Sequence, residues 1–141
     1  MQLKVLRFGI WKVVAPVNGD GRCEVEDQLV ELLADPKLKG YAVGFFALWE
    51  RIPQFGPRQL PTALYHSVDE AHGIYEFIKG PLRLLCFEAD GALVVCSHVI
   101  RKRSQKIRKQ DKAPAIALRE AFLSARAADN VQWMKEADGE I

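Results

Sequence analysis

The sequence predicts an α+β fold in a single domain spanning residues 1–141, and three observations lead to that prediction. The chain is long enough to close one hydrophobic core but short for two independent ones. Helical patterns dominate residues 24–53 and the stretch after residue 113. Between them, strand-like segments follow one another closely. Such grouping of strands is typical of an antiparallel sheet with helices packed on it.

The N-terminal half begins with a predicted strand over residues 3–14, which is rich in Val, Ile, Phe and Trp. We expect Pro16 and the turn-forming sequence NGDG, residues 18–21, to end it. Residues 24–34 then form a helix in this prediction, because Val25 and Leu29 share one side and acidic residues lie at its start.

A second helix is predicted from the Asp35–Pro36 pair, a favourable cap and first turn, up to Pro53. Together the two helices would form a helical hairpin. The aromatic residues Phe45, Phe46 and Trp49 recur at helical spacing, which favours a place in the core over the lining of a ligand pocket.

The C-terminal half begins with three short segments that predict an antiparallel meander. They cover residues 73–80, 81–88 and 92–100, and the residues between them favour turns. A C-terminal helix is predicted to start at Pro114, and its apolar pattern can be followed as far as Trp133 and Met134. The expected order is therefore N-terminal strand, helical hairpin, antiparallel strand meander and C-terminal helix.

Composition narrows the class of protein. No stretch has the apolar length needed to cross a bilayer, and the N-terminus lacks the pattern of a signal peptide, so we expect a cytoplasmic protein without a membrane partner. Three widely spaced cysteines without C-x-x-C spacing argue against a disulfide framework or a zinc knuckle, and predict reduced, mostly buried thiols. On a regular strand Cys96 and His98 would share a face, and with His66 and His72 they suggest a metal site; the wide ligand spacing favours no metal and no cofactor.

Positive charge is concentrated in residues 101–112, which we call the basic segment. Its sequence RKRSQKIRKQDK holds seven Lys or Arg and one Asp, a net charge of +6. The whole chain carries +2, so the other 129 residues carry −4. Such a cluster on a mildly acidic body attracts phosphates, although a solvated loop would have the same composition.

Residues 74–123 resemble toxins of the RelE/ParE superfamily, and most closely its phage-derived HigB-like branch. Members carry runs similar to LWELR, RVLYF and LLHGFxKKSQKTP. The corresponding runs here are IYEFI at residues 74–78, RLLCF at 83–87 and VCSHVIRKRSQKI at 95–107. The match is most specific at Lys102, Arg103, Ser104, Gln105 and Lys106, which align with the family's KKSQK.

The resemblance implies a RelE-like fold and a toxin of a type II toxin–antitoxin system that inhibits translation. Its partners would be mRNA, free or on the ribosome, and a cognate antitoxin protein. Cleavage without a metal requires the ribose 2′-hydroxyl to attack the neighbouring phosphate, with proton transfer and stabilisation of the phosphorane charge. Arg83 is the candidate for gripping the phosphate, since a guanidinium binds phosphate oxygens in a bidentate manner.

His98 is the candidate for proton transfer, since a histidine titrates near neutral pH. A partly buried histidine bonded to backbone is the alternative. Lys102 and Arg103 complete the catalytic set, at the rim of the sheet. The expected RNA-binding residues are Lys79, Arg101, Lys106, Arg108 and Lys109, where Lys79 could also assist Arg83. Glu76 is expected to pair with Arg83 or another cation, or to act as a base.

The chain departs from the family pattern at Ile78, where a basic residue is frequent, and at Cys86, where tyrosine is frequent. These departures leave two other functions open. One is a non-catalytic RNA- or ribosome-binding module. The other is a ParE-like poison of a topoisomerase, acting through protein contacts.

Overall fold

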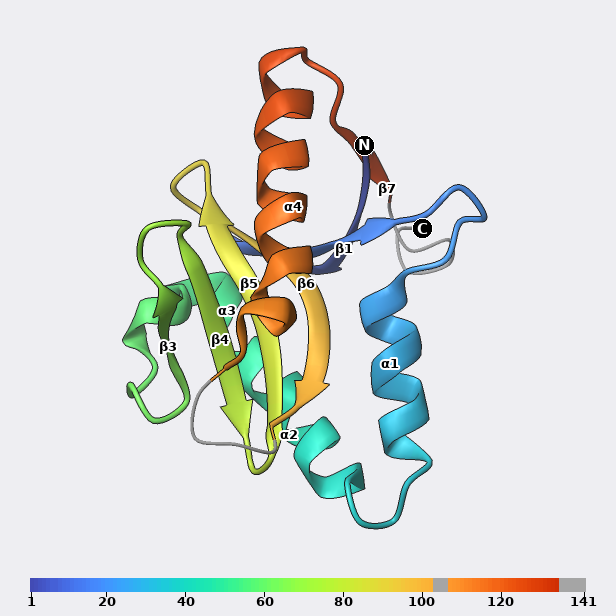
Figure 1. Cartoon of the computed structure of the whole chain (residues 1–141), viewed down its shortest axis with the longest axis vertical. Helices are drawn as coiled ribbons and strands as arrows, with labels where there is room; N and C mark the ends of the chain where they lie inside the picture. Colours follow the sequence, from blue (N-terminus) through green and yellow to red (C-terminus); the bar gives the residue numbers. More distant parts are fainter. Residues whose placement is uncertain (103–106, 135–141) are drawn as a thin grey trace.

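A seven-stranded sheet forms the centre of the molecule (Figure 1). The computed structural model describes residues 1–102 and 107–134. The strand order is β3-β4-β5-β6-β2-β1-β7, in which β6 pairs parallel with β2, β1 pairs parallel with β7, and every other pair is antiparallel. The strands are β1 (Gln2–Arg7), β2 (Lys12–Val17), β3 (Tyr65–Asp69), β4 (Ile74–Lys79), β5 (Leu82–Ala89), β6 (Leu93–Arg101) and β7 (Gln132–Met134).

Helices cover both faces of the sheet, so the expected α+β class is confirmed. One face carries α1 (Glu24–Leu33), α2 (Lys39–Trp49) and the short α3 (Ile52–Phe55), which is followed by a 3-10 turn η1 (Pro57–Gln59). The long helix α4 (Lys109–Ala127) crosses the other face, in front of β4, β5 and β6 in Figure 1. We call these two the hairpin face and the α4 face.

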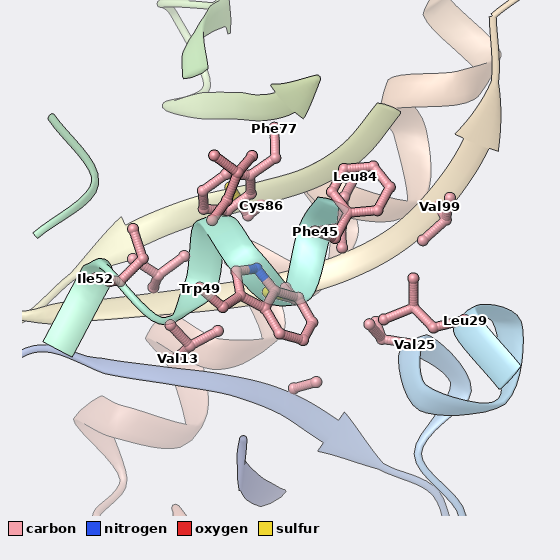
Figure 2. Packing of buried hydrophobic residues seen from close by; sticks show 14 of the residues in the cluster. Val13, Val25, Leu29, Phe45, Trp49, Ile52, Phe77, Leu84, Cys86 and Val99 are labelled. Atoms are coloured by element: carbon pink, nitrogen blue, oxygen red, sulfur yellow. The ribbon is translucent and has the colours of Figure 1, made fainter. Parts of the chain in front are cut away.

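The larger core lies between the hairpin face and helices α1 to α3 (Figure 2). Phe45 and Trp49 of α2 are fully buried, as the sequence predicts, and Phe46 is partly buried beside them. Figure 2 shows Phe45 and Trp49 packed against side chains of the sheet such as Phe77, Leu84 and Cys86. Burial of this apolar surface is the main force that holds the hairpin to the sheet.

A second core lies beneath α4. Phe122 packs with its ring centroid 5.6 Å from that of Phe87, and Ala115 lets the helix approach the sheet. The sheet contributes alternate residues of its central strands, including Ile74 and Leu85. A sheet buried on both faces explains why β5 and β6 read as nearly continuous apolar runs.

The predicted opening strand is wrong in one respect, because residues 3–14 form parts of two strands. β1 and β2 pair antiparallel and turn at residues 8–11. Pro16 does not end the strand but pairs with Leu3 inside the hairpin. The Lys12 N–H donates to Ala92 O on the β6 side of β2, and the backbone N of every second residue, including Pro16, faces that side. Because the β2–β6 ladder ends at Val14, a backbone N–H at residue 16 would have no partner in β6, and proline is tolerated there.

Two predicted helix starts are also wrong. Residues 36–38 form a turn in which Asp35 Oδ1 accepts from the Lys37 N–H, and α2 begins only at Lys39. α4 begins five residues before Pro114, because Asp111 Oδ2 accepts from the backbone N–H of Arg108 and caps the first turn there. The last part of the basic segment is therefore helical.

Two short strands are absent from the predicted order. β3 pairs with β4 and extends the meander by one strand. β7 pairs with β1, so Trp133 and Met134 do not continue the C-terminal helix, which ends at Ala127. In the part of the chain that the structure describes, we find no helix with both the length and the apolar content to cross a membrane.

Candidate nucleic-acid interface

The basic segment connects the end of β6 to the start of α4. Arg101 is exposed at the last position of β6, and the Lys102 N–H donates to Pro81 O over 2.8 Å, which keeps this end beside the start of β5. Ile107 packs against the second core and Lys109 is exposed in the first turn of α4. The segment is thus anchored at both ends. Arg101 pairs with Leu82 and so lies on the hairpin face, whereas Lys112 of α4 forms an ion pair with Asp69 of β3 at 3.3 Å.

Arg83 lies on the α4 face at the same end of the sheet. Its Nη1 donates to Gly80 O over 2.7 Å and to Leu82 O over 2.9 Å, and Nε lies 3.7 Å from Glu76 Oε1. The side chain is 13% exposed, and among the described residues Nη2 has no hydrogen-bond acceptor. These contacts hold the guanidinium in one orientation.

Glu76 contacts both Arg83 and His66, and the sequence analysis did not predict that His66 belongs to this site. The Glu76 side chain is 3% exposed, and its Oε2 lies 2.6 Å from His66 Nε2. His66 Nδ1 lies 2.8 Å from Thr62 O, which can only accept, so Nδ1 carries a hydrogen. The expected structural pairing of Glu76 with cations is confirmed.

His98 also lies on the α4 face, but both of its ring nitrogens are occupied within the chain. Nε2 donates to Asp111 O over 2.9 Å, and Nδ1 accepts from Ser97 Oγ over 2.8 Å. These partners fix the neutral tautomer. Burial lowers the pKa of His98, and the bond to Asp111 O partly opposes that shift. His98 thus joins β6 to the first turn of α4.

The expected sharing of a face by Cys96 and His98 is wrong. Leu85 pairs with His98 and Cys86 pairs with Cys96, so Ser97 is an extra residue in a β-bulge. Cys96 faces the hairpin side, where all three cysteines are free and buried, and burial raises its pKa. Within residues 1–102 and 107–134, no group of three or more His, Cys, Asp or Glu is arranged to hold a metal ion.

Lys79 does not lie beside Arg83. It pairs with Leu82, whose side chain belongs to the core of the hairpin face, and its aliphatic stem packs against Gly44 of α2. Arg108 is exposed and forms an ion pair with Asp111 at 3.1 Å. Of the other predicted site residues, Arg103 and Lys106 lie outside the described residues.

The sheet carries a charged cluster, namely His66, Glu76 and Arg83, beside the end of β6 at which the basic segment begins. Arg83 offers a preorganised guanidinium, which is the group suited to a phosphate. The His66–Glu76 pair lies at the rim of the site, where the His66 side chain is 41% exposed. The sequence motifs identified Arg83 and Glu76 as candidate site residues. His66 was missed because it lies on β3, a strand that the sequence analysis did not predict.

The comparisons with known proteins give no independent support for any family: no protein-family model matches the chain, and no curated protein matches it.

Proposed function

We propose that this protein is a RelE/HigB-like toxin that binds mRNA through its basic segment and cleaves it without a metal at the adjacent sheet. The observation that carries the proposal is the position of Arg83 on the α4 face beside the end of β6, where it pairs with Ile100, the residue that precedes the basic segment, while the Lys102 N–H donates to Pro81 O. The phosphate backbone of RNA would lie along the cations, which provide affinity without sequence preference. Arg83 would contact the scissile phosphate through Nη2.

The resemblance of residues 74–123 to that family supports the proposal, and so does the order of elements. The chain has an N-terminal strand region, a helical hairpin, an antiparallel meander and a C-terminal helix, which is the order that the resemblance implies. Fold alone does not determine activity, so the argument for cleavage depends on the charged cluster.

The test is controlled expression of the chain in growing cells, with and without the protein encoded next to its gene. We expect expression alone to arrest growth and to fragment translated mRNA, and we expect the neighbouring protein to prevent both effects. Harmless expression with intact mRNA would contradict the proposal. Growth arrest with intact mRNA and damaged DNA would instead favour a topoisomerase poison.

A non-catalytic RNA- or ribosome-binding module is the second candidate, and one observation favours it. Both ring nitrogens of His98 and three of the donor positions of Arg83 are engaged or enclosed within the chain. The variants Arg83→Ala and Arg101→Ala separate the two functions. A catalytic Arg83 predicts that Arg83→Ala abolishes cleavage but retains most RNA affinity, whereas Arg101→Ala lowers affinity alone.

A further inference from the structure

The bulge at Ser97 decides which residues of β6 face the proposed RNA site. Before the bulge, Val94 and Cys96 face the hairpin side and Val95 faces α4. After it, Val99 faces the hairpin side, while His98 and Ile100 face α4. Without the extra residue, the residues of β6 after position 97 would each face the opposite side of the sheet, and His98 would point into the core of the hairpin face.

A side chain from α1 occupies the edge of β6 at this bulge. The ladder between β2 and β6 ends at the pair Val14–Val95, so β2 does not reach the bulge. There the Val99 N–H donates to Gln28 Oε1 over 2.8 Å, and Gln28 Nε2 donates to Val99 O over 3.2 Å. One amide therefore makes both bonds that a neighbouring strand would make.

We propose that Gln28 is a positioning residue of the RNA site: by binding the N–H and the C=O of Val99 together, it holds the bulge at Ser97 and thereby keeps His98 on the α4 face, where His98 binds the first turn of α4. The expected effect on RNA cleavage rests on the proposed function, whereas the effect on the bulge depends only on the contacts of Gln28. Because His98 donates to Asp111 O, the position of His98 also affects the position of the first turn of α4.

Binding both groups of Val99 requires a side chain with one donor and one acceptor, which the Gln28 amide supplies. A glutamate has the same shape, but when ionised it has no donor for Val99 O and repels it. Once protonated, its carboxylic acid again offers one donor and one acceptor. Gln28→Glu is therefore a variant that should be defective at neutral pH and restored at acid pH.

The experiment compares wild-type protein with Gln28→Glu and Gln28→Leu by NMR, following the Val99 amide and the ring nitrogens of His98, and measures RNA cleavage of each. At pH 7.5 we expect both variants to displace these resonances and to lose about tenfold in cleavage, the order expected when one or both hydrogen bonds to Val99 are lost. At pH 5 the resonances of Gln28→Glu should return toward those of wild type at the same pH, because the Val99 carbonyl favours the protonated form and raises the pKa of the introduced carboxyl above its ordinary value of about 4.3. Those of Gln28→Leu should not return. Gln59→Glu is the matched control, since Gln59 is exposed and bonds only Arg51 among the described residues.

Wild-type His98 resonances in both Gln28 variants at pH 7.5 would overturn the positioning role. Displaced resonances with unchanged RNA cleavage would overturn its functional consequence. If the wild-type protein itself does not act on RNA, the proposed function fails, yet the resonances still decide whether Gln28 holds the bulge. The acid-restored spectrum of Gln28→Glu separates loss of the bulge from failure to fold.

Discussion

At the scale of single residues, Glu76 has the most consequential environment in the site. Its buried carboxylate lies between His66 and Arg83, and its Oε1 has no hydrogen-bond partner among the described residues. A buried charge of this kind is tolerated only while its partners remain, because an isolated ion in the interior has lost its hydration. Glu76 therefore links the stability of the meander to the presentation of Arg83.

Glu76→Leu should lower the free energy of unfolding by about 3 kcal/mol, since removing one partner of a buried pair leaves the other uncompensated. Urea denaturation of wild type and variant measures this loss. Glu120→Gln, an exposed position on α4, is the control and should change stability by less than about 0.5 kcal/mol. A value for Glu76→Leu as small as that of the control would show that the cluster is not a stabilising unit.

His98 gives the protein a component of stability that depends on pH. Burial holds its folded-state pKa below the ordinary value of about 6.5, so the unfolded chain binds the proton more readily. Stability from this group is fully present above pH 6.5 and is lost as pH falls through the lower, folded-state value. NMR titration should give a His98 midpoint below 6.5, and His98→Gln should remove this part of the pH dependence between pH 7.5 and 5.5; a midpoint above 6.5 would contradict it.

At the scale of elements, the turn between β4 and β5 sets the position of Arg83. Gly80 has φ of +55° and accepts the Nη1 hydrogen bond of Arg83 through its carbonyl oxygen. A Cβ at this position would lie closer to Cε1 of the Tyr41 ring in α2 than two carbon atoms can approach. Only glycine satisfies both requirements, the left-handed backbone and the close approach.

Gly80→Ala should therefore destabilise the protein by about 1–3 kcal/mol, because it adds backbone strain to a steric conflict. Gly40→Ala is the matched control within α2, since a Cβ added there would meet no neighbouring atom within 4 Å and the helix favours alanine by up to about 1 kcal/mol. Thermal unfolding of the two variants should shift in opposite directions. Equal shifts would contradict the close packing of the turn on α2.

The elements also explain how far sequence reasoning reached. The meander and the helices α1 and α2 follow from local periodicity and turn residues, and they were predicted apart from their ends. The β1–β2 hairpin and the β3–β4 hairpin join neighbouring segments and were not predicted. β7 pairs with β1 from the other end of the described chain, which no local pattern encodes. Likewise, the bulge that turns His98 away from Cys96 depends on Gln28, 71 residues before Val99. Part of the candidate site was therefore predictable from its motif, while its orientation was not.

At the scale of the whole molecule, the separation of charge governs encounter with RNA. The basic segment carries +6 and the remaining residues −4, so attraction is directed to that segment. Affinity should fall steeply as salt increases, because each phosphate contact releases bound counterions. The sign of this dependence is the same whether or not the protein cleaves its ligand.

Removing two of the cations should reduce that dependence by a calculable amount. For Arg101→Gln combined with Lys102→Gln, the slope of log K against log salt should become shallower by about 1.4 on single-stranded RNA. The control removes two arginines that pair with acids elsewhere, Arg22 with Asp27 and Arg126 with Asp90, and should leave the slope unchanged. Fluorescence anisotropy across salt concentrations gives both slopes, and identical changes in the two double variants would refute a localised interface.

The central claim is that the protein cleaves RNA by attack of the ribose 2′-hydroxyl. The direct measurement is incubation of the purified protein with an mRNA, free and on ribosomes, in the presence of a chelator, followed by analysis of the RNA ends. We expect wild-type protein to yield fragments ending in 2′,3′-cyclic phosphate, and Arg83→Ala to yield none. RNA that is bound by the wild-type protein but stays intact in both settings would contradict the claim and leave a binding module.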